Sequence, residues 1–172
     1  MHRYIGDGEY MLKKVKIKER NADLKSALEP YIRQAPNSRF AGLIPFKLWF
    51  YALADRGKEN KLKWWMKNKL GEPISLIDTV KVNESRVLMK KLLRNKGYFN
   101  VVVNPEIRYG KRKSKVNFKI NKNKPYYISE VSYKTSFSRI NHFLKNIMEE
   151  SLLISGDLYD IDVFEKERQR LV

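Results

Sequence analysis

The sequence predicts an α+β fold built from repeated β-α-α-β-β units. Three observations support this prediction: apolar residues at the spacing of strands, apolar residues at the spacing of helices, and an internal repeat. Phe99, Val101 and Val103 alternate with Asn100 and Val102, and Val116, Phe118 and Ile120 alternate with Asn117 and Lys119. This is the period of half-buried strands. Apolar residues at helical spacing precede these strands, and the pattern of the first strand and helix recurs 116 residues later.

Composition limits the class of protein. The 172 residues are 42% hydrophobic, which is enough to build one ordinary domain or two small ones. No apolar run reaches the roughly 18 residues of a membrane-spanning helix, and the amino terminus lacks the apolar stretch of a signal peptide. The chain has no cysteine, which excludes disulfides and thiolate metal sites. Its net charge of +17 favours anionic partners such as nucleic acid or anionic lipid, and equally serves to keep a surface soluble.

The first strand is expected from Tyr10 to Lys18, where apolar residues alternate with lysines. A helix follows, with Asn21 or Asp23 as its N-cap and Pro30 as a distortion in its middle. Its apolar face is formed by Leu24, Leu28, Tyr31 and Ile32.

A second helix is expected to end at Gly97. Apolar residues and the stem of Lys96 line one of its faces, and glycine adopts the positive φ that commonly follows a last helical turn. Tyr98 and Phe99 come next, before the two strands of the hairpin. Phe99 and Phe118 share the parity of the aliphatic residues around them, so both are predicted in the core. The apolar face of the helix consists of Met89, Leu92 and Leu93.

A second copy of the unit is predicted from the alignment of the sequence with itself. Tyr10 aligns with Tyr126 at an offset of 116 residues, whereas Met89 aligns with Leu171 at an offset of 82. The difference, 34 residues (116 minus 82), predicts an insertion in the first copy. By the smaller offset, the second counterpart of Gly97 would fall at about residue 179 (97 plus 82), so the chain is expected to stop inside its second copy.

The predicted domains follow from this alignment. Residues 1–124 form a first, complete domain with an insertion over about residues 37–73, and residues 125–172 form a partial second domain. The second domain is predicted to contain a strand over residues 126–134, a helix over about residues 138–149 and the start of a second helix after Asp160 or Asp162.

The insertion contains all three tryptophans and two short predicted helices. Each has one main apolar face: Phe46, Trp49, Phe50 and Leu53 in the first helix, and Leu62, Trp65, Met66 and Leu70 in the second. Further apolar residues lie off these faces, which indicates either packing on the insertion's own domain or contact with a partner or lipid interface. The residues predicted for such a docking or lipid contact are Trp49, Trp64, Trp65, Lys63 and Lys67.

No pattern of catalytic or metal-binding residues stands out. His2 and His142 have no ligand partner at metal spacing, and no phosphate-binding glycine loop or nucleophile triad is recognisable. The aspartates from Asp157 to Asp162 fit helix capping better than a calcium loop. The sequence therefore predicts no enzymatic activity, cofactor or metal. Nucleic acid could bind the basic turn from Lys111 to Lys115, but the neighbouring strand aromatics are expected to face the core.

The order of elements, with a helix that ends in Gly-Tyr-Phe and a tandem copy behind it, resembles the POTRA domain of the outer-membrane assembly family that includes BamA and TamA. The stretch from Lys96 to Phe99 and the beginnings of the paired strands carry this resemblance. In detail, the tryptophan-bearing insertion and the phrase from Pro36 to Arg39 resemble TamA-like proteins of Bacteroidetes type. The paired strand beginnings are Gly8 to Leu12 and Lys124 to Ile128, and Gly156 to Asp160 resembles the approach to a second helix.

The resemblance implies a periplasmic, protein-binding module that precedes an outer-membrane β-barrel and helps to insert or export outer-membrane proteins; the signal and barrel are not in this sequence. It further implies that the strand after Gly97, Tyr98 and Phe99 is an edge able to pair with an extended client or partner. Basic nucleic-acid binding and binding to an anionic membrane surface are the alternatives. The residues expected to form the pairing edge are Asn100, Val101, Val102, Val103 and Asn104.

Overall fold

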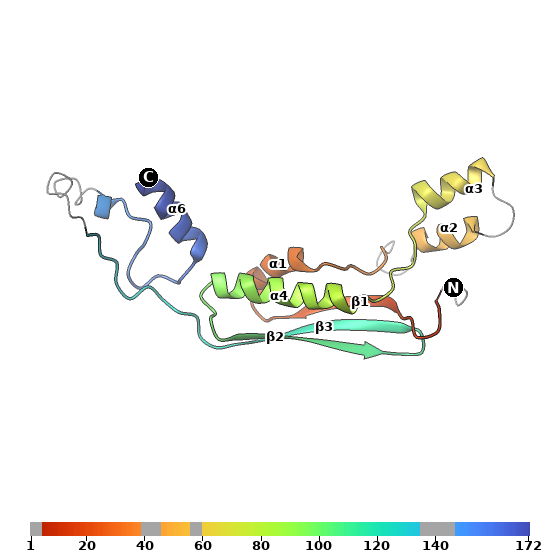
Figure 1. Ribbon diagram of the computed structural model, residues 1–172, viewed down its shortest axis with the longest axis horizontal. Coiled ribbons are helices and arrows are strands. Elements are labelled where there is room, and N and C mark those ends of the chain that lie inside the picture. Colours follow the sequence, from red (N-terminus) through yellow and green to blue (C-terminus); the bar gives the residue numbers. More distant parts are fainter. Residues whose placement is uncertain (1–4, 39–45, 56–59, 135–146) are drawn as a thin grey trace. The chain divides into compact units, whose positions relative to one another are not determined.

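The computed structural model describes residues 5–38, 46–55, 60–134 and 147–172 (Figure 1). The chain divides into two compact units. The first comprises Met1–Val87 and Asn104–Ile120, and the second comprises Leu88–Val103 and Asn121–Val172.

The chain contains a three-stranded sheet with the strand order β1-β3-β2, most of which belongs to the first unit. Strand β1 (Met11–Lys18) runs parallel to β3 (Lys113–Lys122), and β2 (Val101–Tyr109) is joined to β3 by a short hairpin turn. Both β1 and β2 are therefore edge strands. A three-stranded sheet with accompanying helices confirms the predicted α+β class.

A β-bulge in β1 changes which residues of the strand face the core. The pairing with β3 shifts between Leu12 and Lys14, so Lys13 is the extra residue. Leu12 and Ile17 are five positions apart and would point to opposite faces of a regular strand, yet both are buried. The bulge is the reason, because it changes the side-chain parity once along the strand.

The core of the sheet contains the apolar residues that strand parity predicts, with one exception. Val101, Val103, Val116 and Phe118 are at most 2% exposed, as predicted. The prediction for Phe99 is wrong: its side chain is 37% exposed, because β2 begins only at Val101 and Phe99 lies in the turn before it.

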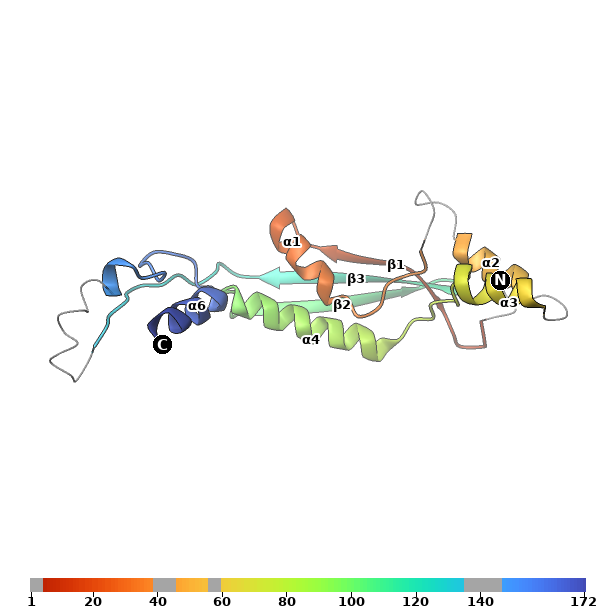
Figure 2. The same cartoon turned by 90° about the horizontal axis from the view of Figure 1, so that it is seen from above.

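Helix α1 (Ala22–Leu28) begins at Asn21, whose side chain accepts a hydrogen bond from the amide of Leu24 at 2.9 Å. Of the two predicted caps, Asn21 is therefore the one in use. A 3₁₀ turn over Glu29–Tyr31 follows and accommodates Pro30. Helix α1 and the beginning of α4 (Thr79–Asn95) lie over the same face of the sheet (Figures 1 and 2).

Helix α4 has well-defined ends. Asp78 caps its start by accepting a hydrogen bond from the amide of Val80 at 2.9 Å. At the other end the amide of Gly97 donates to the Arg94 carbonyl and the amide of Tyr98 donates to the Leu93 carbonyl, which is a Schellman motif. The φ angle of Gly97 is +84°, which confirms the predicted helix stop. The buried stripe of α4 consists of Val82, Ser85, Met89 and Leu93.

The insertion forms a helical hairpin of α2 (Phe46–Ala54) and α3 (Lys61–Trp65), and α3 continues into a π-helical segment over Met66–Leu70. Helix α2 packs against this π-helical segment. The predicted apolar faces are partly exposed. Leu48, which lies off the predicted face, is 2% exposed, whereas Trp49, Leu53, Leu62 and Trp65, which belong to the predicted faces, are 40–64% exposed.

Packing between the two helices of the hairpin decides which side of each helix is buried. An ideal Cβ on Gly71 would lie 3.1 Å from Cα of Tyr51, so the two backbones approach each other closely there. The amide of Gly71 also bonds the Met66 carbonyl at 2.7 Å, five residues back, and this wider turn breaks the 3.6-residue period on which the prediction depends.

In the second unit, helix α6 (Ile161–Leu171) begins at Asp160, whose side chain accepts a hydrogen bond from the amide of Asp162 at 3.0 Å. The predicted start after Asp160 is confirmed. The predicted strand over residues 126–134 is reduced to one antiparallel bridge, Tyr127 to Leu158, because no other segment in the described part of the chain pairs with it. The predicted helix over residues 138–149 lies largely outside the described residues; its last three are helical.

One set of backbone contacts occurs in both units at the offsets of 116 and 82 residues. It ties the start of one segment to the residues before a helix, and an aspartate caps that helix. In the first unit the contacts are Leu12 N to Ser75 O (2.7 Å), Ile77 N to Tyr10 O (2.8 Å), the bridge Met11 to Leu76 and the cap Asp78. In the second they are Ile128 N to Asp157 O (2.8 Å), Tyr159 N to Tyr126 O (2.9 Å), the bridge Tyr127 to Leu158 and the cap Asp160.

Candidate functional site

The outer side of β2 is the open edge of the sheet. No strand in the described ranges pairs with that side, whereas the start of β1 is bonded on its outer side to Ser75 and Ile77. Along β2, Val101 and Val103 are buried and Val102 is 51% exposed on the other face. The predicted edge from Asn100 to Asn104 thus begins in the turn and continues into an edge strand.

The hairpin turn indicates which backbone groups of β2 point outward. The amide of Gly110 donates to the carbonyl of Lys113 at 2.7 Å, which makes these two residues a hydrogen-bonded pair. Bonded pairs alternate along an antiparallel ladder, so even-numbered residues of β2 bond β3 and odd-numbered residues turn their N–H and C=O groups outward. Pro105, which has no N–H, falls on the outward series, the position that suits proline in an edge strand.

Gly97 contacts two other segments of the second unit. Its carbonyl accepts a hydrogen bond from the amide of Tyr126 at 3.0 Å. An ideal Cβ on Gly97 would lie 2.9 Å from the carbonyl oxygen of Tyr159 and 3.2 Å from that of Tyr126, both of them backbone atoms. Gly97 is therefore required both for its φ angle and for the space that its missing side chain leaves to these two segments.

Tyr98 and Phe99 extend the same set of contacts. The ring centroid of Phe99 lies 5.2 Å from that of Tyr126 and 5.0 Å from that of Tyr159. The ammonium of Lys122 lies 5.1 Å from the centre of the Tyr98 ring. The Gly-Tyr-Phe residues thus pack on the chain that follows β3, and this explains the partial exposure of Phe99.

Lys96 adds an ion-pair cluster that the sequence did not indicate. Its ammonium donates to the carboxylates of Asp160 at 2.7 Å and Asp162 at 2.9 Å. Burial alone would lower the pKa of Lys96, but the hydrogen bonds to the two aspartates outweigh it and raise the pKa above its ordinary value. The alignment of Asp78 with Asp160 at the offset of 82 residues could have located the cap, but not its lysine partner.

A second polar cluster surrounds Glu167, which is 2% exposed. Its carboxylate accepts hydrogen bonds from Arg170 at 2.7 Å, Tyr133 at 2.6 Å and the amide of Leu152 at 3.0 Å. The bonds from Arg170, with those from Tyr133 and Leu152, outweigh desolvation and lower the pKa of Glu167 to about 2. The cluster fixes backbone in the second unit and is structural.

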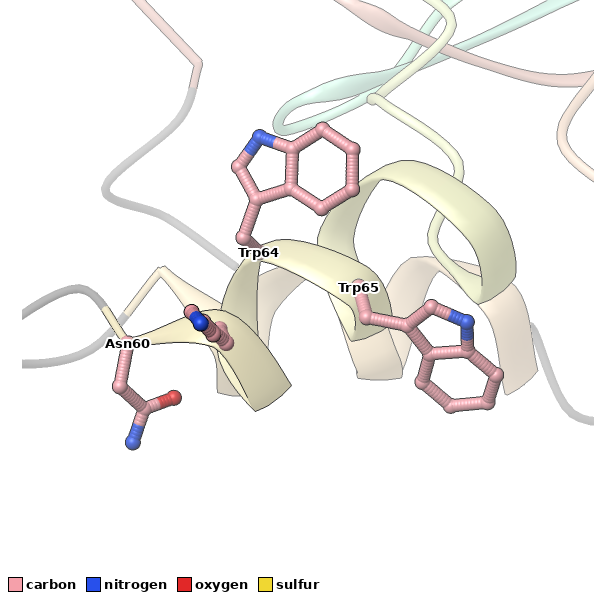
Figure 3. A pocket seen from close by; sticks show the side chains of 4 residues that line it. Asn60, Trp64 and Trp65 are labelled. Carbon is pink, nitrogen blue, oxygen red and sulfur yellow. The ribbon is translucent and has the colours of Figure 1, made fainter.

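The helical hairpin of the insertion presents its tryptophans to solvent. Trp64 and Trp65 line a pocket together with Asn60 and Lys61, and their rings leave the helix in different directions (Figure 3). Of the two lysines predicted for docking, Lys67 is engaged inside the hairpin: it bonds Asp55 at 2.6 Å and lies 5.2 Å from the centre of the Tyr51 ring.

Lys63 takes part in the start of α3, where its amide donates to the Asn60 side chain at 2.8 Å. Among the residues that the structure describes, no three His, Asp or Glu side chains form a group that could hold a metal ion. None of the helices in these ranges is both long and apolar enough to cross a membrane.

The chain is compared here with curated proteins, solved structures and protein families. A search of curated proteins finds no match. Among solved structures, the chain is similar to the crystal structure of Haemophilus influenzae BamA POTRA3-5, at 13% identity and a TM-score of 0.44. The alignment covers 94% of this chain and 49% of the other, so the chain spans about half of that structure's length.

A family model gives the more specific result. Residues 54–123 match the POTRA family, described as the surface antigen variable number repeat. The matched segment begins at the last residue of α2 and ends just after β3. It contains α4, Gly97 and the β2–β3 hairpin, so this part of the chain is similar to a POTRA domain.

Proposed function

We propose that the chain is a periplasmic, non-enzymatic POTRA scaffold of an outer-membrane protein assembly or translocation factor, which binds client proteins or assembly partners. The family match over residues 54–123 carries this proposal, because it includes the helix, the glycine stop and the edge-strand hairpin of the domain. The tryptophan-bearing insertion supports a closer relation to TamA-like proteins of Bacteroidetes type.

The proposal includes a tandem arrangement, in which residues 1–124 form one POTRA-like domain and residues 125–172 form part of a second. The recurrence of the same backbone contacts and the same aspartate cap at fixed offsets supports it. Ser85 and Glu167 also correspond at the offset of 82 residues, and both are buried polar residues of a helix. Each accepts a hydrogen bond from a backbone amide of a preceding segment, Arg33 in one case and Leu152 in the other.

The binding mode that we propose is the addition of a strand to β2. An extended peptide would bond the outward N–H and C=O groups of Val101 and Val103, while Pro105 limits the pairing to the first part of the strand. Val102 belongs to the inward series, so proline at this position would remove a bond to β3 and damage the sheet itself. A test of the edge must therefore leave the β2 sequence unchanged.

Amide hydrogen exchange followed by NMR provides such a test. The probe is a short peptide of alternating valine and threonine. The amides of Val101 and Val103 are expected to gain protection when it binds, while those of Val102 and Asn104 are already protected in the free protein. The matched control is the same peptide N-methylated at every residue, which leaves no N–H group on either edge and should not bind.

Equal protection of odd and even amides, or equal binding of the methylated and unmodified peptides, would refute strand addition at β2. The family-level proposal has a separate test, which is a β-barrel encoded downstream in the full-length gene.

The net charge of +17 is compatible with two other classes of partner, nucleic acid and anionic membranes. Nucleic acid would have to use the basic hairpin turn, and Phe118 on the adjoining strand is 1% exposed and so cannot stack on a base. Salt-sensitive retention on a DNA fragment would support that alternative. An anionic membrane surface is the second candidate, because the insertion exposes its tryptophans.

A further inference from the structure

Five apolar side chains are exposed on the hairpin formed by α2, α3 and the π-helical segment. Their exposed fractions lie between 40% and 64%, and two of them line a pocket. Single exposed apolar residues are common, but a group of large ones on one small element indicates a contact surface. The five residues are Trp49, Leu53, Leu62, Trp64 and Trp65.

Other residues also join the two arms of the hairpin. Leu48 and Ala54 are buried, at 2% and 5% exposure. The ion pair of Lys67 with Asp55 and the close approach of Gly71 to Tyr51 join its two arms. With these contacts in place, about half of each tryptophan side chain stays exposed, at 47–54%.

The second arm of the hairpin is positively charged. The segment from Asn60 to Gly71 contains four lysines and no acidic residue. Lys61 and Lys69 are exposed, and Lys61 lines the pocket together with Trp64 and Trp65. Residues three and four apart share a helix face, so Lys61 lies between the two tryptophans that follow it.

We infer that this hairpin docks on the surface of an anionic phospholipid membrane. Tryptophan favours the boundary between headgroups and acyl chains, and lysine reaches toward headgroup phosphates while its stem lies along apolar surface. The rings of Trp64 and Trp65 leave the helix in different directions (Figure 3), so the helix would lie in the membrane plane with a ring on either side of Lys61. Charge complementarity selects the anionic membrane: acidic headgroups match the lysines of this surface.

This inference deepens the membrane alternative and involves different residues from the β2 edge, so the two can fail separately. Tryptophan emission is a direct probe of the hairpin because all three tryptophans of the chain, at positions 49, 64 and 65, lie in it. The test mixes the protein with vesicles of phosphatidylcholine alone, or of phosphatidylcholine with phosphatidylglycerol, at low and high salt. Co-flotation and a blue shift of the emission are expected with phosphatidylglycerol at low salt, and weaker binding at high salt.

Paired variants separate the hairpin from the general charge of the protein. Replacement of Lys61 and Lys69 by glutamine should weaken partitioning roughly 30-fold, the effect of two basic residues near an anionic membrane. Replacement of Lys90 and Lys91, which are exposed on α4, removes the same charge and should have a much smaller effect.

The tryptophans are tested in the same way. Trp64→Ala combined with Trp65→Ala should reduce flotation and the blue shift of the remaining Trp49 emission, with an unchanged circular dichroism spectrum. The control is Val80→Ala combined with Val87→Ala, which removes exposed apolar groups from α4.

Several results would overturn the inference. These are equal binding to neutral and anionic vesicles, equal loss with the Lys90 and Lys91 control, or flotation without any change in tryptophan emission. Concentration-dependent dimerisation that the tryptophan variant abolishes, without vesicle binding, would assign the surface to a second copy of the chain instead. Peptide binding at β2 should not change in any of these variants.

Discussion

A side chain at Gly97 should destabilise the second unit for two separable reasons. The first is the φ angle of +84°, which costs an L-residue about 1–2 kcal/mol. The second is the 2.9 Å separation between the added Cβ and the carbonyl oxygen of Tyr159, which forces a backbone shift. Overpacking of this kind costs about 1–3 kcal/mol, so Gly97→Ala should destabilise the unit by about 2–5 kcal/mol in total.

Gly156 provides the matched control for this substitution. Its φ angle is +93°, but an ideal Cβ there has no neighbour within 4 Å. Gly156→Ala should therefore carry only the φ contribution, about 1–2 kcal/mol. The difference between the two variants measures the close approach of the chain to Gly97.

Amide hydrogen exchange at Tyr126 and Tyr159 is the appropriate measurement, because the tryptophans of the chain report only on the insertion. Both amides are bonded in the second unit and should exchange faster in Gly97→Ala than in Gly156→Ala. Equal destabilisation by the two variants, within about 0.5 kcal/mol, would refute the close-approach argument. A neutral Gly97→Val would refute the helix stop as well.

Two further predictions concern the polar clusters of the second unit. Asp160→Ala removes both the N-cap of α6 and the less exposed partner of Lys96, so urea denaturation should show that the free energy of unfolding falls by about 1–3 kcal/mol. The Asp162 carboxylate is 65% exposed, so Asp162→Ala should lower the free energy of unfolding by less than about 1 kcal/mol. The reverse order would contradict the assignment of the cap. The second prediction concerns pH. Because Arg170 lowers the pKa of Glu167 from 4.5 to about 2, its contribution to stability is fully present above pH 4.5 and is lost as the pH falls toward 2. Urea unfolding between these pH values should show this loss, and Glu167→Gln should remove it; an unchanged slope would contradict the prediction.

Features that depend on a few neighbouring residues were predictable from the sequence. The Gly97 helix stop, the Asn21 cap and the start of α6 after Asp160 each follow from local chemistry, namely a positive φ or a side chain that bonds a nearby amide. The core valines of β2 follow equally from strand parity.

Features that depend on residues distant in the sequence were not predictable in this way. Phe99 continues the parity of β2, but contacts with Tyr126 and Tyr159 draw it into a turn outside the strand. In the helical hairpin, the contact between α2 and the π-helical segment decides which side of each helix is buried, and no periodicity reports that contact. The partners of Lys96 lie more than sixty residues away in the sequence.

The candidate binding surfaces were predictable only in part. The edge character of β2 follows from the strand order that the fold imposes, whereas the outward series of its amides required the Gly110 to Lys113 hydrogen bond. Trp49 and Trp65 are about half exposed, but helical periodicity alone could not show whether their apolar faces pack inside the domain or face outward. Side chains that serve an external partner disrupt the periodicity from which packing is inferred.

The side chain of Asn37 holds the two ends of the insertion together. Its amide nitrogen donates to the Pro73 carbonyl at 2.6 Å, and its oxygen accepts from the Ser75 amide at 2.8 Å. The chain thus leaves the sheet-bearing unit and returns to it at nearly the same point, and loop-closure entropy changes only slowly with the length of what lies between. The helical hairpin can therefore be lengthened, shortened or exchanged over evolution with little effect on the sheet, as a surface that varies independently of the domain that carries it.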